Sequence, residues 1–502
     1  MNIKQAKQEI TNTLRAYLAK DGQGNYLIPV NRQRPVLLMG PPGIGKTQIM
    51  AQIAAETGVG LISYTITHHT RQSAMGLPFI EKRRFDGKEY AVTEYTMSEI
   101  LAAVYTLMES TGIREGILFL DEINCVSETL APMMLQFLQN KTFGNQRLPD
   151  GWIIVAAGNP PEYNKSVRDF DVVTLDRVKR IDVKEDFSVW KEYAYRQNLH
   201  GAIISYLDIK KENFYRIETS VDGMEFATAR GWEDLSELLL VYEQLGLKLD
   251  REVVGQYIQL PRIARDFAGY LDLYYKYQKT YHVDEIIEGK WHAITVSELK
   301  AAPFDEKLSV LGLLLARLSE SAGLTREQDA LTELLYADLL DFKERLSAGE
   351  PANSILEGLA QHRREDLARA AEAGQLDKEK RGRTQRAIEC LTRYRERLIA
   401  KNIADGGELD AVRGWFQEEV DARKSAGETA GRHFDNAFRY LEQAFGDSQE
   451  LVLFVTEMTA GYNTSWYVEH FGCDAYFRHN KELLFDDTRR RIQADILAAK
   501  GE

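Results

Sequence analysis

Short apolar runs separated by helical patterns dominate the first part of the chain. A charged segment at about residues 3–19 has helical periodicity. Four apolar runs follow it, each bounded by turn or polar residues, at 35–39, 60–66, 116–120 and 152–157. Runs of this kind are typical of strands buried on both faces of a parallel sheet. The pattern up to about residue 190 therefore predicts an α/β fold.

The second part of the chain shows apolar residues spaced three and four apart over long stretches. Only three prolines occur there, Pro261, Pro303 and Pro351. This spacing predicts a mainly α-helical region. The segment 363–401 is dense in Arg, Lys and Glu and is predicted to be an exposed helical pair, with breaks at Gly374 and Gly382. Such a segment is either a solvated helical face or a functional arm.

Composition narrows the class of protein. With 502 residues the chain is expected to form two to four domains, and 44% hydrophobic residues suffice for sizeable cores. The formal net charge of −13 argues against a general nucleic-acid binder, although a local basic patch stays open. Cys125, Cys390 and Cys473 are too scattered for a disulfide framework or a metal site, which fits a reducing cytosol. Neither a secretion signal nor a membrane span is indicated, so we expect a cytoplasmic protein.

The stretch GPPGIGKT at 40–47 follows one predicted strand and opens a helical segment. Glycines at 43 and 45 let the backbone curl so that several N–H groups face a phosphate, while Lys46 supplies a cation and the Thr47 hydroxyl a ligand for Mg²⁺. The following helix directs its partial positive charge at the same anion. The predicted nucleotide-binding residues are Gly40, Pro41, Pro42, Gly43, Ile44, Gly45, Lys46, Thr47 and Gln48.

Two adjacent carboxylates end the apolar run at 116–120. Asp121 is placed to hold Mg²⁺ through water, and Glu122 is placed to orient and polarise an attacking water molecule. An acidic pair directly after a buried strand, in a chain that already has a phosphate loop, favours this catalytic interpretation over a surface pair.

Other polar residues also follow predicted strands or open a helix. Asn159 follows the apolar run at 152–157, at the end of the predicted strand. It is either a contact to the γ-phosphate or the lytic water, or a simple turn residue. Arg177 and Arg180 precede a short predicted strand, Ile181-Asp182-Val183, and are either surface charges or arginines that reach a neighbour's nucleotide. Arg230 opens a helix and is a candidate for contacting phosphates from a lid.

Together these motifs resemble those of the AAA+ ATPases, and more closely those of the MoxR branch. The resemblance covers roughly residues 20–280 and is carried by GPPGIGKT, LFLDE (118–122), Asn159 at the sensor 1 position, DRVKRI (176–181) and ATARGWEDL (227–235), which is similar to a sensor 2 helix. It implies a P-loop AAA+ parallel-sheet core at 1–200 and a helical lid at 201–290. A mainly helical region at 291–502 would follow, where the aromatic segment 444–484 is either core or a partner-docking unit.

MoxR-type proteins carry an insert in helix 2, and residues of about 68–95 lie at the corresponding place. Asp86-Gly87 predicts a hairpin turn within it. In relatives such inserts face a central pore, so the resemblance makes His68, His69, Arg71 and Phe85 candidates for substrate contact; the alternative is a hairpin that only packs on its own module. The tandem histidines lack partners at metal-ligand spacing.

The resemblance implies an ATPase that uses ATP and Mg²⁺ and forms a ring, usually a hexamer. One subunit would supply Lys46, Thr47, Asp121, Glu122 and Asn159, and its neighbour Arg177 or Arg180. Hydrolysis would move the lid bearing Arg230 and remodel a bound protein, together with a partner that contains a von Willebrand factor A domain. The alternatives are a nucleic-acid-stimulated motor, as in restriction-associated relatives, and a scaffold that nucleotide assembles with little turnover.

Overall fold

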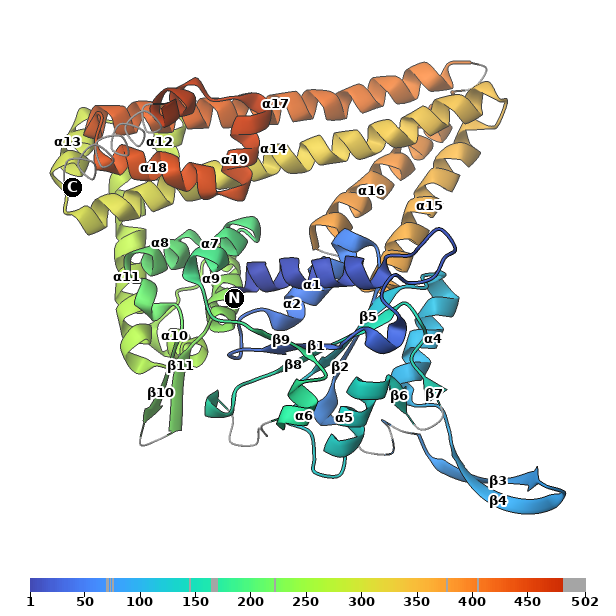
Figure 1. Cartoon of the computed structure of the whole chain (residues 1–502). Coiled ribbons are helices and arrows are strands. Elements are labelled where there is room, and N and C mark those ends of the chain that lie inside the picture. The colour runs from blue at the N-terminus through green and yellow to red at the C-terminus, as the bar shows by residue number, and fades with distance from the viewer. Residues whose placement is uncertain are drawn as a thin grey trace, which may run out of the picture. The chain divides into compact units, whose positions relative to one another are not determined.

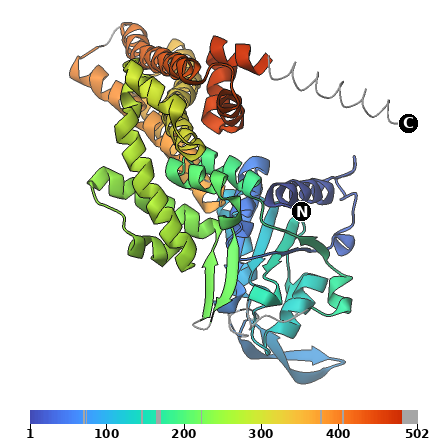
Figure 2. The same ribbon diagram turned by 90° about the vertical axis from the view of Figure 1, so that its left-hand side faces the viewer.

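The computed structural model describes residues 1–68, 72, 74, 76–143, 146–163, 170–220, 223–375, 378–403 and 406–481. The chain divides into two compact units (Figures 1 and 2). Unit 1 comprises residues 1–186 together with 361–385, and unit 2 comprises residues 187–360 and the chain from 386 onward. The boundaries proposed from sequence, at 200 and 290, remain predictions.

A five-stranded parallel sheet forms the centre of unit 1. Its strands are β1 (Val36–Met39), β2 (Gly60–Thr65), β5 (Gly116–Asp121), β8 (Trp152–Gly158) and β9 (Lys179–Asp182). They lie in the order β2-β5-β8-β1-β9, with every neighbouring pair parallel. The four predicted strands are confirmed, and the predicted α/β class is correct. Since all strands run in one direction, their last residues lie along one edge of the sheet.

The apolar runs form these strands because both faces of the sheet are covered. Every residue of β1 and β8 is buried. Trp152 is wholly buried, and a Cβ atom added to Gly116 on the neighbouring strand would lie 2.6 Å from its ring. Glycine is therefore needed at 116 for space. The unit-1 helices are α1 (Ile3–Leu18), η1 (Val30–Arg32), α2 (Lys46–Thr57), η2 (Ile66–His68), α4 (Glu99–Thr111), α5 (Ala131–Asn140), η3 (Pro161–Tyr163) and α6 (Val172–Leu175).

The predicted hairpin is present as β3 (Pro78–Phe85) and β4 (Lys88–Tyr95), with register from Pro78↔Tyr95 to Phe85↔Lys88. Asp86 and Gly87 both have positive φ, 49° and 78°, as a tight turn of this kind requires. Every residue of β3 is exposed, and Figure 1 shows the hairpin extending away from the sheet. A second short pair is β6 (Thr142–Phe143) with β7 (Gln146–Arg147). His69, Arg71 and the side chain of His68 lie outside the described residues.

Unit 2 is almost entirely helical, as predicted. Its elements are α7 (Phe187–Arg196), α8 (Gly201–Ile209), η4 (Lys211–Asn213), β10 (Arg216–Ser220), β11 (Gly223–Ala227), α9 (Ala229–Leu245), α10 (Arg251–Tyr257), α11 (Pro261–Tyr281), α12 (Val283–Ile287), α13 (Ala293–Ala301), α14 (Phe304–Ser347), α15 (Ala352–Glu372), α16 (Lys378–Ala400), α17 (Glu408–Phe445), α18 (Gln449–Ala460) and α19 (Tyr462–Phe471). Residues 361–385 of α15 and α16 belong to unit 1.

One hydrophobic core joins the predicted lid to the helical region that follows it. Trp232 and Phe267 from the lid share this core with Leu314 of α14 and with Phe454 and Tyr467. The last two residues belong to the aromatic segment 444–484, so this part of the segment is core. The lid and these helices are thus one packed body.

Helix α14 is the one described helix that is long and apolar enough to cross a membrane. It has 44 residues, and 56% of its most apolar window is buried inside the protein. Helices in the cores of soluble proteins can have the same length and composition, so these two features are weak evidence for a membrane span.

The loop between α15 and α16 covers the edge of the sheet in unit 1. The Leu61 N–H of the edge strand β2 donates to the Ala373 carbonyl at 3.0 Å, and Gln375 Nε2 donates to the Val59 carbonyl at 2.9 Å. The predicted helical pair is confirmed, with its break at Gly374. The second predicted break, at Gly382, is wrong, because the residue lies inside α16. The hydrogen bond to Ala373 gives the Leu61 N–H, at the edge of the sheet, an acceptor.

We expect Gly374→Ala to loosen this edge. Gly374 has φ of 68°, and an added Cβ would lie 3.1 Å from Leu61 Cβ, so local stability should fall by about 1–2 kcal/mol. Amide hydrogen exchange at β2 should become faster. Gly382→Ala is the matched control: it has no atom within 4 Å of the new Cβ and should stabilise α16 by about 0.5–1 kcal/mol. Unchanged exchange at β2 in Gly374→Ala would show that the loop does not protect the edge.

Candidate nucleotide-binding site

A glycine-rich loop connects β1 to α2 at the carboxyl edge of the sheet. Gly43 and Gly45 have φ of 73° and 92°, values that other residues rarely adopt. A Cβ atom at Gly40 would lie 2.8 Å from the Val183 carbonyl oxygen, so the start of the loop also requires glycine. Helix α2 begins at Lys46, and its first turn directs N–H groups and the positive end of the helix dipole into the loop.

Lys46 lies inside the loop, with its side chain only 8% exposed. Its Nζ atom donates to the Gly40 and Pro41 carbonyl oxygens, each at 2.8 Å, and to Asn159 Oδ1 at 2.9 Å. A buried ammonium group is costly unless oxygen atoms surround it, and here two segments of the unit supply them. The predicted phosphate-loop lysine and the predicted Asn159 are therefore in direct contact.

Thr47 and the acidic pair meet beside this lysine. Thr47 Oγ1 donates to Asp121 Oδ2 at 2.9 Å, and the Glu122 N–H donates to Asp121 Oδ1 at 2.9 Å. A hydroxyl and a carboxylate oxygen side by side are the hard ligands that Mg²⁺ favours. The residues present therefore fit the predicted Mg²⁺ ion.

Glu122 has an unusual backbone conformation and a defined partner. Its φ is 55°, in the left-handed region that carries a cost for residues other than glycine. Its Oε2 atom accepts a hydrogen bond from Thr67 Oγ1 at 2.8 Å. Thr67, in η2 after β2, was not predicted to belong to the site, and its only sequence signal is a hydroxyl residue soon after a buried strand.

The candidate arginines lie at the surface of their units. Arg177 donates from its guanidinium to Gln139, and Arg180 Nη2 lies 2.8 Å from Asp182 Oδ1. Both belong to unit 1. Arg230 is the second residue of α9, in unit 2, and is exposed. The structure thus brings Lys46, Thr47, Asp121, Glu122 and Asn159 together. Arg177 and Arg180 contact other residues of unit 1, and Arg230 belongs to unit 2.

The cysteines are free thiols. Burial raises the pKa of Cys390 and Cys473 to about 11. Burial and the charges of Glu122 and Asp121 also raise the pKa of Cys125, next to the site. Over the described residues, no group of three or more His, Cys, Asp or Glu side chains is arranged for a metal ion.

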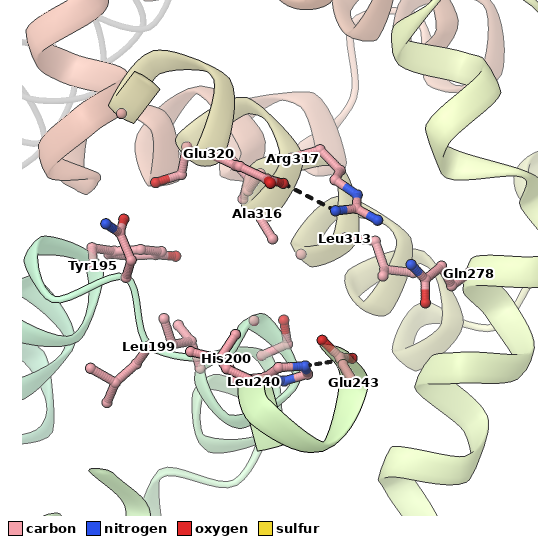
Figure 3. Close-up of a pocket in the computed structure, with 18 of the residues that line it drawn as sticks. Tyr195, Leu199, His200, Leu240, Glu243, Gln278, Leu313, Ala316, Arg317 and Glu320 are labelled. Carbon is pink, nitrogen blue, oxygen red and sulfur yellow. Dashed lines mark hydrogen bonds and ion pairs between the residues drawn. The ribbon is translucent and has the colours of Figure 1, made fainter. Parts of the chain in front are cut away.

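A cavity of about 460 Å³ lies within unit 2, away from these motifs in the sequence (Figure 3). Two pairs of its charged or titratable groups lie close together. His200 Nε2 lies 2.9 Å from Glu243 Oε1, and Arg317 Nη1 lies 3.0 Å from Glu320 Oε2. Burial is the largest effect and would raise the pKa of Glu243, but the hydrogen bonds with His200 and Tyr275 and the charges of His200 and Arg317 together outweigh it, so the pKa is lowered. Glu243 and Glu320 thus each have a basic partner at the cavity.

The parallel sheet, the glycine-rich loop and the lysine and carboxylate contacts define a P-loop ATPase domain. Residues 36–181 match the model of the family described as "ATPase family associated with various cellular activities (AAA)". The chain therefore carries an AAA family domain at these residues, which supports the predicted enzyme class, an ATPase.

Solved structures give weaker likenesses. A "putative ATPase" from Cytophaga hutchinsonii ATCC 33406 is 17% identical, with a TM-score of 0.22, over 36% of this chain and 51% of that one. NtrX from Brucella abortus in complex with ADP is 16% identical, with a TM-score of 0.24, over 41% of this chain and 44% of NtrX. The chain thus spans only about half the length of these proteins. No curated protein matches the chain.

We expect Asp121→Asn to raise the Mg²⁺ concentration needed for hydrolysis. The amide keeps the side-chain size but removes the charge beside Thr47, and loss of such an outer contact costs roughly 10–100-fold in metal affinity or activity. Hydrolysis measured against Mg²⁺ concentration tests this, and a chelator should abolish activity in both proteins. Asp150→Asn removes an exposed carboxylate whose partner is Arg147 and should leave the curve unchanged. Equal curves for Asp121→Asn and the wild type would contradict the assignment.

Proposed function

We propose that the protein is an ATP-hydrolysing ring of the MoxR type that couples hydrolysis to remodelling of a protein complex. The observation that carries the proposal is the hydrogen-bonded group at the carboxyl edge of the sheet. Lys46 contacts Asn159, and Thr47 contacts Asp121, so residues from the ends of β1, β5 and β8 surround one loop.

Each residue of this group has a distinct task in the proposed site. The loop N–H groups and Lys46 bind the phosphates, with Gly40 to Gln48 forming the binding segment. Thr47 and Asp121 would hold Mg²⁺, which neutralises charge on the phosphates when bound. Glu122 orients the attacking water and accepts its proton, and Asn159 fixes the geometry beside the γ-phosphate.

A neighbouring copy completes the site in this proposal. Arg177 and Arg180 are exposed on unit 1 and available to an adjacent nucleotide, where a guanidinium would stabilise the charge that develops during phosphoryl transfer. Immediately before them, helix α6 exposes Val172 at 81% and Val173 at 57%. Adjacent exposed apolar side chains suit a surface that another subunit covers.

The hairpin β3–β4 supports the remodelling part of the proposal. It exposes Phe79, Ile80 and Phe85 along one strand and Tyr90 along the other. A hairpin that buries none of these side chains in its own unit offers them to a client protein. His68, His69 and Arg71 remain predicted client contacts, Arg230 a predicted lid contact with nucleotide, and a von Willebrand factor A domain protein a predicted partner.

We expect Glu122→Gln to retain nucleotide binding and to lose hydrolysis. The amide preserves size but cannot accept a proton, so turnover should fall at least about 100-fold while affinity for ADP stays within about 3-fold. Glu109→Gln, an exposed change on α4, is the control. Unchanged turnover in Glu122→Gln would remove Glu122 from its role. Normal binding with negligible turnover in the wild type would favour the nucleotide-assembled scaffold.

Mixing two inactive variants tests the ring. Lys46→Ala keeps the arginines but loses the phosphate contact, whereas Arg177→Ala or Arg180→Ala does the opposite. If an arginine acts on a neighbour's nucleotide, an equal mixture should regain about one quarter of the wild-type rate, because that fraction of interfaces in a closed ring pairs an intact loop with an intact arginine.

Two further measurements accompany the mixing experiment. The wild-type rate per subunit should rise with protein concentration as the mass shifts to a ring in the presence of ATP, and it should be indifferent to DNA. No recovery with either arginine, together with a concentration-independent rate, would contradict the ring. Strong stimulation by DNA would favour the nucleic-acid motor over the remodelling function.

A further inference from the structure

Asn124 ties the turn after β5 to the end of β8. It is 3% exposed, and its Nδ2 atom donates to the Asn159 backbone carbonyl at 2.7 Å. The neighbouring Ile123 N–H donates to the Ala157 carbonyl at 2.9 Å. The turn that carries Glu122 and the strand end that carries Asn159 are thus joined by two hydrogen bonds.

Gly158 leaves the space that Asn124 occupies. A Cβ atom at residue 158 would lie 2.6 Å from Asn124 Oδ1 and 2.9 Å from its Cγ, and the three nearest atoms all belong to Asn124. Gly158 does not have a positive φ. Residue 158 must therefore be glycine because the side chain of Asn124 packs against its Cα atom.

Packing alone does not account for an amide at residue 124. Asn124 Oδ1 is buried and has no hydrogen-bond partner within the described part of the chain. Burying an unpaired oxygen is unfavourable, and a leucine, whose larger side chain branches at the same atom, would avoid that cost. What the amide provides, and leucine does not, is the donor to Asn159.

From this geometry we infer that Asn124 is a positioning residue for hydrolysis. Asn124 fixes the backbone of Asn159, and the side chain of Asn159 in turn accepts from Lys46 Nζ at 2.9 Å. The inference rests on the proposed function, since it assigns Asn124 a part in the same site. Nucleotide binding depends chiefly on the loop N–H groups, and no hydrogen bond among the described residues joins Asn124 to them. Substitution of Asn124 should therefore change turnover more than nucleotide affinity.

The first test separates positioning from packing. Asn124→Leu should lower kcat roughly 10–100-fold, because a small misplacement of a catalytic contact suffices for such a loss. Affinity for a fluorescent ADP analogue should stay within about 3-fold, while the thermal midpoint should fall only slightly, because the Asn159 carbonyl loses its donor. A residue that only packs would lower the midpoint and leave kcat per folded molecule unchanged, and that result would overturn the inference.

The second test asks whether Asn124 acts through Asn159. Asn159→Ala should lower kcat, and adding Asn124→Leu to it should lower kcat no further, since the residue being positioned has lost its side chain. Additive losses would overturn the inference. If Asn159→Ala leaves hydrolysis unchanged, the role proposed for Asn159 fails, and if the wild type does not hydrolyse ATP, the proposed function itself fails.

A third comparison uses the close approach at Gly158. Gly158→Ala should be harmful in the wild type because its Cβ meets Asn124, yet it should add little to Asn124→Ala, which removes the atoms it would strike. This comparison remains informative where a single variant folds poorly, because the double variant is expected to fold better than Gly158→Ala. Equal harm in both backgrounds would show that Gly158 is needed for another reason.

Discussion

The buried ammonium group of Lys46 is the interaction on which the site depends. Three of its oxygen partners come from the phosphate loop after β1 and from Asn159 after β8. These partners can converge only because β1 and β8 are neighbours in the sheet, with Met39 opposite Gly158. The contact between Lys46 and Asn159 thus depends on the strand order. If β8 did not lie beside β1, the buried ammonium group would lose the Asn159 acceptor.

The sheet and its loop could be predicted because their signals are local. Each strand is a short apolar run, and the glycines, Lys46 and Thr47 lie within one octapeptide. The acidic pair directly follows a buried strand, so its place at the carboxyl edge also follows from sequence. Asn159 needed the additional knowledge that its strand lies beside the phosphate loop, and the structure provides this through the pairing of β1 with β8.

Thr67 and Asn124 were missed because their partners are remote in sequence. Thr67 bonds to Glu122 across 55 residues, and Asn124 bonds to Asn159 across 35. Threonine and asparagine near strand ends are ordinary turn residues, and only the fold distinguishes these two. Gly382 illustrates the reverse error: a glycine suggests a break, but the helix around it is held by buried neighbours such as Ile388 and Leu391.

The core of unit 2 constrains how any lid motion can be transmitted. Trp232 of α9 and Phe267 of α11 pack edge to face, with ring centroids 5.3 Å apart, in the core that also contains Leu314 and Leu318 of α14. The salt bridges of Lys191 with Asp208 and Glu457 add polar links between α7, α8 and α18. Packed cores resist sliding, because a shift of even a fraction of a side chain opens voids or creates clashes. A movement of α9 would therefore carry the packed part of α14 with it, and this 44-residue helix would extend the movement beyond the predicted lid.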